Sequence, residues 1–169
     1  LTTGTSFVTK EHSVISGFRN PTKEIEFEIS KNNLNALIAT HCFTESVHQQ
    51  GKILFADYWT WTKYLIDISK DYKYKWFIKA HPYFNEKEKQ IFDELVRNQS
   101  SLVEISADVA IDVLFDKGID VVFTCYGTIG FDASIKNIPV IAASNNATYK
   151  NYSFCVQPAS IDELQSVSY

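Results

Sequence analysis

The segment Asp120-Val-Val-Phe-Thr-Cys-Tyr-Gly-Thr-Ile-Gly-Phe-Asp132 indicates a β-strand that leads directly into a glycine turn and a helix. Residues 120–124 are the most strand-like run of the chain, because Val121, Val122 and Phe123 are large and apolar. Gly127 allows a tight turn, and we expect the helix that follows to extend to Lys136. Such a unit is typical of parallel α/β sheets.

The rest of the sequence continues this alternation of strand and helix. Further strands are predicted at residues 36–39, 76–78, 102–105 and 139–143, and helices at 58–68, 85–98, 108–117 and 161–167. Asp57 is placed to cap the helix that starts at residue 58, and Gly118 is placed to end the helix at 108–117. The sequence therefore predicts an α/β fold with a doubly wound parallel sheet, a Rossmann-like architecture.

The chain has 169 residues, which is the length of one domain. Its first part is polar with brief apolar spots, and only the alternation of Ile25, Phe27 and Ile29 is strand-like. We expect residues 1–34 to be a linker or a domain-edge segment and residues 35–169 to be the folded domain. Because the sequence contains no Met, we also expect it to be part of a longer polypeptide.

Composition excludes several classes of protein. Hydrophobic residues make up 45% and aromatic residues 14% of the chain, which excludes disorder, collagen and coiled coil. A formal charge of −4 offers no basic field for a nucleic-acid backbone. No apolar run of about 18 residues is present, and we expect a cytoplasmic protein. The widely spaced Cys42, Cys125 and Cys155 are expected to be reduced, buried thiols.

Most of the chemically active side chains follow the predicted strands. In an open parallel sheet, the ligand crevice lies beyond the carboxyl ends of the strands. The residues at these ends are Thr40, His41, Thr44, Glu45, Ser46, His48, His81, Pro82, Thr124, Tyr126, Gly127, Thr128, Ser144 and Asn145. Histidines, a carboxylate, hydroxyls and a glycine turn are therefore predicted to converge on one rim.

The turn at Gly127 and Thr128 favours an anion. A helix that starts at Thr128 would direct its free N–H groups and its positive dipole end into the crevice, where phosphate is the natural occupant. The Thr128 hydroxyl could add a hydrogen bond, and Asp132 could accept hydrogen bonds from a ribose diol. The alternative is purely structural: Gly127 turns the chain and Thr128 caps the helix.

His81 and Glu45 are the candidate catalytic residues. His81 is predicted to donate to phosphate, either as an imidazolium or as a neutral N–H, and Glu45 could act as general base for an acceptor hydroxyl. The alternative for His81 is a packed or solvated side chain. We expect no metal site, because His41, Glu45 and His48 lie in a loop and no further Cys/His cluster supports them.

Five segments together resemble the nucleotide-binding C-terminal half of GT-B glycosyltransferases that build bacterial capsules and other surface polysaccharides. These segments are Ala39-Thr-His-Cys-Phe-Thr-Glu-Ser-Val-His48, Phe55-Ala-Asp-Tyr-Trp-Thr-Trp61, Trp76-Phe-Ile-Lys-Ala-His-Pro82, Thr124-Cys-Tyr-Gly-Thr-Ile-Gly-Phe-Asp132 and Ile138-Pro-Val-Ile141. The resemblance covers about residues 35–158, and its more specific part is the His-Pro pair followed by the Gly-Thr-x-Gly-x-acid helix start.

The resemblance implies how these residues would bind a nucleotide sugar. His81 and the Gly127/Thr128 turn would hold the donor's phosphate, and Asp132 stands where the family usually has a glutamate that contacts the ribose or the sugar. Asn145 and Tyr149 would edge the pocket. The residues predicted to bind the nucleotide are His41, Thr44, His81, Tyr126, Gly127, Thr128, Asp132 and Asn145, with Glu45 and His81 as the catalytic pair.

The resemblance also implies substrates and partners. Similar enzymes use CMP-, CDP- or UDP-linked donors, and many inverting members need no bound metal, so we expect no tightly bound cofactor. The second partner would be a glycan acceptor, held by an acceptor-binding half that should precede residue 1. The fragment is therefore expected to bind a donor without transferring it. Peripheral association of the full enzyme with the inner face of a bacterial membrane remains open.

Two other functions are compatible with these residues. A nucleotide-sugar epimerase can share the two-domain GT-B-like fold and a similar crevice. A flavodoxin-like or receiver-like interaction domain would have no catalytic role. A receiver needs an acidic cluster after its first strand, where this chain has Thr40-His41-Cys42 instead.

Overall fold

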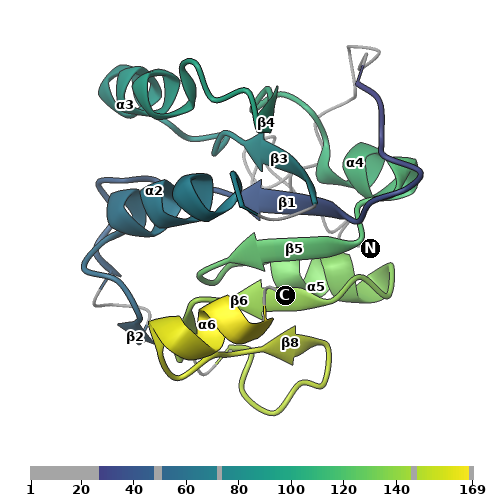
Figure 1. Cartoon of the computed structure of the whole chain (residues 1–169). Helices are drawn as coiled ribbons and strands as arrows, with labels where there is room; N and C mark the ends of the chain where they lie inside the picture. The colour runs from purple at the N-terminus through teal and green to yellow at the C-terminus, as the bar shows by residue number, and fades with distance from the viewer. Residues whose placement is uncertain (1–26, 48–50, 72–73, 146–147, 168–169) are drawn as a thin grey trace, which may run out of the picture.

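Six parallel strands form the central sheet, in the order β4-β3-β1-β5-β6-β8 (Figure 1). This is a computed structural model, and it describes residues 27–47, 51–71, 74–145 and 148–167. The strands are β1 (Asn35–Ala39), β3 (Lys75–Lys79), β4 (Leu102–Ile105), β5 (Val121–Thr124), β6 (Val140–Ala142) and β8 (Cys155–Val156). From β1 the chain builds out to one edge and then returns to build the other, so the predicted doubly wound, Rossmann-like α/β fold is confirmed.

The strand β1 lies in the middle of the sheet and pairs on both sides. Ala36 is in register with Trp76 of β3 and with Val121 of β5. All five residues of β1 are buried. A strand covered on both faces needs a continuous apolar run rather than an alternating pattern, which explains the sequence Ala36-Leu-Ile-Ala39.

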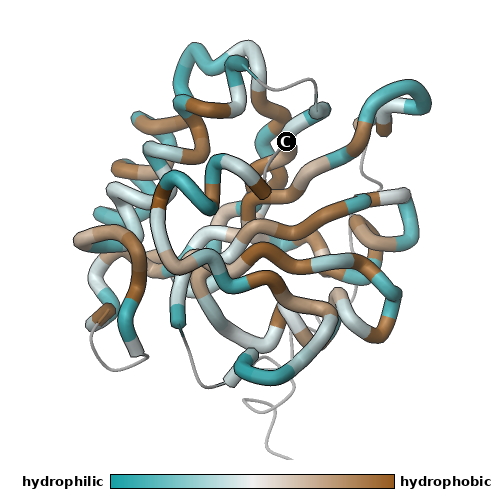
Figure 2. Tube along the Cα trace, turned by 60° about the horizontal axis from the view of Figure 1, so that its bottom comes forward, coloured by the Kyte–Doolittle hydropathy of each residue, from teal (hydrophilic) through white to brown (hydrophobic). Residues whose placement is uncertain are grey.

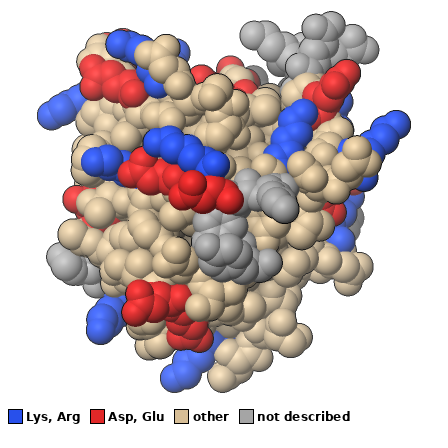
Figure 3. Space-filling model, in the orientation of Figure 1, with Lys and Arg blue, Asp and Glu red and all other residues tan. Residues whose placement is uncertain are grey.

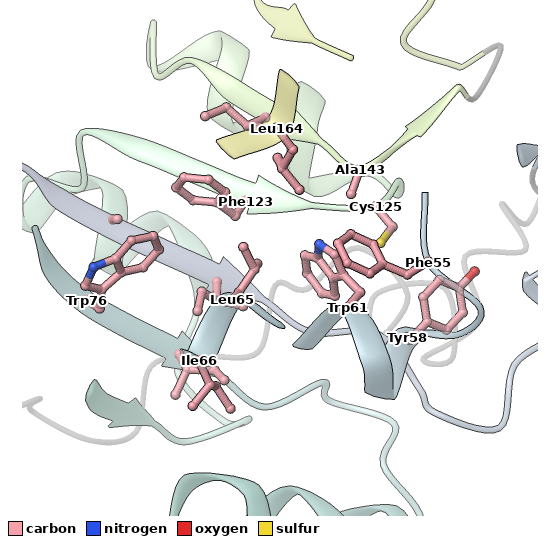
Figure 4. Close-up of a cluster of buried hydrophobic side chains, with 14 of the residues drawn as sticks. Phe55, Tyr58, Trp61, Leu65, Ile66, Trp76, Phe123, Cys125, Ala143 and Leu164 are labelled. Carbon is pink, nitrogen blue, oxygen red and sulfur yellow. The ribbon is translucent and has the colours of Figure 1, made fainter. Parts of the chain in front are cut away.

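Helices cover both faces of the sheet. On one face lie α2 (Tyr58–Ile68), α3 (Glu86–Val96) and α6 (Ile161–Val167), and on the other lie α4 (Ile111–Lys117) and α5 (Ile129–Ile135). In Figure 1, α2 and α6 are in front of the sheet and α5 is behind it. The first core cluster includes Trp61 and Leu65 of α2, Phe123 of β5 and Leu164 of α6 (Figure 4). The layers therefore form two hydrophobic cores, one on each side of the sheet.

Side-chain caps fix where the helices begin. The carboxylate of Asp57 accepts a hydrogen bond from the backbone of Thr60, as the sequence predicts. The helix α3 starts with a capping box, in which Asn85 and Glu88 each accept a hydrogen bond from the other's backbone N–H. Gly118 ends α4 in the left-handed conformation, with φ 115°.

The predicted helix at residues 108–117 is wrong at its start. The structure begins α4 at Ile111, and residues 107–110 form a turn in which the backbone N–H of Val109 donates to the carbonyl of Ser106. The Ser106 hydroxyl also accepts from the N–H of Asp108 at 3.4 Å. This serine competes with the helix for backbone groups, and it leaves the segment 107–109 beside the sheet edge.

The alternation at Ile25, Phe27 and Ile29 does not produce a strand in the described residues. Ile25 lies outside them, and residues 27–30 are irregular. The Phe27 ring packs on Phe77 with a centroid distance of 5.1 Å, and the Ile29 side chain lies beside Gly118. Both side chains pack against the folded domain, which accounts for the two apolar residues without strand pairing.

Three short strands were not predicted from the sequence. The strands β2 (Lys52–Ile53) and β7 (Ser144–Asn145) pair antiparallel in a separate sheet, and β8 adds the sixth strand of the main sheet. Each has two residues, which is too short to show a period of two.

The surface is polar and mixed in charge around an apolar interior. Figure 2 shows hydrophobic segments mainly through the middle of the molecule and hydrophilic ones mainly at its periphery. On the face drawn in Figure 3, basic side chains lie among acidic ones. Among the described residues, no helix is both long enough and apolar enough to cross a membrane.

The contact between Gly130 and Tyr149 predicts that Gly130→Ala destabilises the fold. A Cβ at residue 130 would lie 2.5 Å from the Tyr149 hydroxyl and ring, closer than atoms can approach. We expect a loss of about 1–3 kcal/mol in the free energy of unfolding, measured by chemical denaturation. Ile135→Ala on the same helix is the control, since Ile135 is 77% exposed. Equal stability of the two variants would contradict this contact.

Candidate functional site

A cavity of about 460 Å³ opens at the carboxyl ends of β1, β3, β4 and β5. Its lining comes from residues 39–41, 79–83, 107–109 and 126–129, together with single side chains from elsewhere. Because β1 lies between β3 and β5, the cavity sits where the strand order reverses, which is the usual ligand site of a doubly wound sheet. Its size is that of a small-molecule site.

The cavity brings together most of the residues predicted from the strand ends. Its lining includes His41, Glu45, His81, Tyr126, Gly127, Thr128 and Asp132. Thr44 and Asn145 do not belong to the lining, and His48 lies outside the described residues. His81 and Thr128 share one rim, because the strands that precede them flank β1.

Thr44, Asn145 and Tyr149 have other positions. The backbone N–H and the hydroxyl of Thr44 both donate to Glu88, at 2.9 and 2.7 Å, which links the loop after β1 to α3. Asn145 is exposed in β7 and pairs with Lys52. Tyr149 is buried, and its hydroxyl donates to the carbonyl of Gly127 and accepts from the N–H of Gly130. Tyr149 therefore supports the glycine turn from behind.

His41 is a buried imidazole whose protonation can be deduced from its partners. Its Nε2 accepts hydrogen bonds from the backbone N–H groups of Cys125 and Tyr126, at 3.2 and 3.4 Å. The ring stacks between Tyr58 and Tyr126, with centroid distances of 4.8 and 4.7 Å. Because Nε2 must offer a lone pair, the proton of the neutral ring is on Nδ1. The ring also lines the cavity.

His81 has the opposite tautomer. Its Nδ1 accepts from the backbone N–H of Tyr83 at 3.3 Å, and the Cys42 thiol lies 3.0 Å from the same nitrogen. The proton of the neutral ring is therefore on Nε2. Of the two protonation states expected from the sequence for a phosphate donor, this geometry fits the neutral N–H.

Burial keeps both rings neutral. It lowers the pKa of His41 to about 3, with a further contribution from His81. Burial also lowers the pKa of His81 to about 4, helped by the positive charge of Lys79 and opposed by Glu88. At neutral pH the cavity is therefore lined by two imidazole rings that carry no charge.

The glycine turn at residues 127–128 leaves polar groups unused. Gly127 has φ 114°, a conformation that residues with a side chain rarely adopt. Thr128 precedes α5, but its hydroxyl makes no capping hydrogen bond, so the capping alternative is not what the structure has. Within the part of the chain that the structure describes, the backbone N–H groups of Thr128 and Ile129 have no hydrogen-bond acceptor. These groups are available to an anion.

Three carboxylates border the cavity, those of Glu45, Asp108 and Asp132. Asp132 is half-buried, and burial together with Asp112 raises its pKa. Glu45 is exposed and accepts a hydrogen bond from the Tyr126 hydroxyl at 3.3 Å. All three carboxylates can accept hydrogen bonds from hydroxyl groups of a ligand. The role of Glu45 as general base stays a prediction.

Two residues of the site were missed in the sequence. Lys79 is only 9% exposed, lines the cavity, and donates from Nζ to the carbonyl of Ala107 at 2.9 Å. A charged residue at the end of the apolar run 76–78 was the available signal. Cys42, expected to be a buried thiol without a further role, contacts His81. Nothing in the spacing of Cys42 and His81, which are 39 positions apart, indicates this contact.

The described residues contain no group of three or more His, Cys, Asp or Glu side chains arranged to hold a metal ion. The chemistry available in the cavity is that of its hydrogen-bond donors, one lysine and three carboxylates. Such a set suits a ligand with an anionic part and a hydroxylated part.

The fold and the cavity define a Rossmann-like α/β domain, and comparison with solved structures shows the same fold. A UDP-GlcNAc 2-epimerase from Neisseria meningitidis, solved with bound UDP-GlcNAc, matches 82% of this chain and 35% of its own, with a TM-score of 0.52 and 14% identity. A Listeria monocytogenes protein, described as a UDP-N-acetylglucosamine 2-epimerase, matches 69% of this chain and 29% of its own, with a TM-score of 0.49 and 16% identity.

This chain thus spans about a third of the length of these proteins. No protein-family model and no curated protein matches the sequence. At this level of identity, the comparisons show a shared fold.

The two lowered histidine pKa values predict that stability falls as the pH drops below 6.5. An unfolded imidazole takes up its proton near pH 6.5, whereas the folded protein does so near pH 4 at His81 and near pH 3 at His41. Between these values the unfolded state binds more protons. The contribution of each ring is therefore complete above pH 6.5 and is lost as the pH falls to its folded pKa.

For each histidine, we expect the free energy of unfolding to fall by about 1.4 kcal/mol for each pH unit by which the pH drops within this window. Denaturation by urea at pH 7, 6 and 5 measures the slope. His81→Asn should make the slope shallower, since one of the two groups is removed. Unchanged stability from pH 7 to pH 5 would show that the rings are not held neutral.

Proposed function

We propose that this chain is the donor-binding domain of an enzyme that transfers a sugar from a nucleotide-activated donor to a surface glycan. The observation that carries the proposal is the convergence of His41, His81, the Gly127/Thr128 turn and Asp132 on one cavity at the switch point of the sheet. The sequence resemblance to GT-B capsule enzymes and the likeness of fold support the same function.

The nucleotide phosphates would lie between His81 and the glycine turn. Phosphate oxygens would accept hydrogen bonds from several N–H groups at this place. These are the backbone N–H groups of Thr128 and Ile129, the Nε2–H of His81 and the Nδ1–H of His41. Lys79 adds a positive charge at the same end of β3. A nucleotide fits the cavity better than free phosphate does, because the cavity is larger than one anion and partly apolar.

The sugar end of the ligand would meet the carboxylates. Asp132, one turn into α5, would accept hydrogen bonds from the ribose diol. The segment Ala107–Val109 lines the side of the cavity toward β4, where Ala107 and Val109 would offer an apolar surface to the base and Asp108 adds a carboxylate. Thr44 and Asn145 would act from outside the cavity, if the remainder of the protein brings the ligand to them.

The reaction needs stabilisation of the departing nucleotide. As the bond between the sugar and the phosphate breaks, negative charge develops on the phosphate oxygens, and N–H donors that are already in place lower the barrier. His81 would serve in this way, while Glu45 at the cavity rim would take the proton of the attacking hydroxyl. The acceptor would be bound by a second domain outside this chain.

An epimerase is the second candidate, and the matched fold favours it. Both solved structures reported above are described as UDP-GlcNAc 2-epimerases. An epimerase would use the same phosphate and ribose contacts but would need no glycan acceptor. The two functions therefore share the nucleotide site and differ in what occupies the open side of the cavity.

Nucleotide binding tests the part that both candidates share. Calorimetric titration of the chain with CMP, CDP, UDP and GDP should give saturable binding of one of them. His81→Ala should weaken that binding about tenfold, because it removes a charge-assisted hydrogen bond. Gln90→Ala, an exposed change on α3, is the matched control and should bind as the unaltered chain does.

Binding of all nucleotides equally weakly, or binding unaffected by His81→Ala, would contradict the proposed phosphate site. A failure of any nucleotide to bind the protein that contains this chain in full would contradict the proposed function as a whole.

The reaction catalysed separates the two candidates. The full protein that contains this chain is incubated with the bound nucleotide sugar in deuterated water without any glycan. An epimerase would release an epimer and incorporate deuterium at the inverted carbon, whereas we expect neither. Addition of a capsular or surface glycan should then release the nucleotide and lengthen the glycan. Deuterium incorporation without glycan would overturn the transferase in favour of the epimerase.

A further inference from the structure

We propose that Cys42 is a positioning residue: its thiol donates to Nδ1 of His81 and so directs the Nε2–H of that ring into the cavity. The inference rests on the proposed function in one respect only, namely that the Nε2–H of His81 binds a nucleotide. The arrangement of the two side chains stands on the geometry alone.

The contact is close and enclosed. Cys42 follows β1 by three residues and is 5% exposed, and its Sγ lies 3.0 Å from Nδ1 of His81. The two side chains belong to loops that follow neighbouring strands, β1 and β3. The thiol therefore links the loop after β1 to the loop after β3.

The thiol is protonated and can act only as a hydrogen-bond donor toward this nitrogen. Burial, together with the carboxylates of Glu45 and Glu88, raises the pKa of Cys42 to about 12. The backbone N–H of Tyr83 also points to Nδ1, at 3.3 Å, so this nitrogen has to be an acceptor. Two donors on one nitrogen leave the ring proton on Nε2.

The thiol has a property that a carboxylate partner would lack. An aspartate beside a histidine stabilises the imidazolium and raises its pKa, as charged partners do. A neutral thiol orients the ring without adding charge, so that His81 stays an uncharged N–H donor despite the fixed tautomer. This agrees with the pKa of His81, which burial and Lys79 lower.

The arrangement is tested by nitrogen NMR of the ligand-free chain, which reports which ring nitrogen of His81 carries the proton. The unaltered chain should show Nε2 protonated. Cys42→Ala should mix in the Nδ1–H form or shift the Nδ1 resonance, and Cys42→Ser, which retains a donor, should restore the original pattern. Cys42→Asp should raise the pKa of His81 by at least one unit. Cys125→Ala removes another buried thiol without a side-chain contact to His81, and should leave the His81 signals unchanged.

Affinity for the nucleotide that binds best in the titration above is the second readout. We expect it to fall about two- to tenfold in Cys42→Ala and to recover in Cys42→Ser. Unchanged His81 resonances in both Cys42→Ala and Cys42→Asp would overturn the proposal. If the nucleotide binds no variant, including the unaltered chain, the proposed function fails, while the NMR result still decides the role of Cys42.

Discussion

The parallel pairing of β1 with β3 on one side and with β5 on the other is the constraint on which the site depends. Because β1 is the first strand and lies in the centre, the chain has to leave it in both directions, and the loops after β1, β3 and β5 meet at one edge. His41, His81 and Gly127 are each within a few residues of these strand ends. Their proximity is a consequence of strand order, although they are spread over almost ninety positions of the sequence.

Burial gives the cavity its chemical character. The aromatic rings around His41 and the burial of His81 exclude water from the two imidazoles. Because the charged form loses its hydration, the pKa of each ring falls and both rings are neutral at pH 7. Positive charge is then concentrated on Lys79, the only Lys or Arg among the described residues that line the cavity. The two kinds of group would therefore act differently on an anionic ligand. The neutral imidazoles would orient it through directional hydrogen bonds, and the lysine would attract it through its positive charge.

The sequence predicted what depends on continuous patterns. The strands at 36–39 and 76–78 were recognisable because burial on both faces requires unbroken apolar runs, and the site followed from the residues just after them. Features that depend on tertiary contact were not recognisable. The two-residue strands carry no period, the start of α4 depends on one serine, and the pairing of Cys42 with His81 joins two loops that only the folded sheet brings together.

The close approach of Tyr149 to the backbone of Gly130 limits which residues can occupy these two positions during evolution. The tyrosine hydroxyl fills the space where a side chain at position 130 would begin, and it also holds the carbonyl of Gly127. A change at either position alone therefore destabilises the turn. Among relatives that retain this turn, positions 130 and 149 should therefore covary, and a side chain at 130 should appear only together with a small residue at 149.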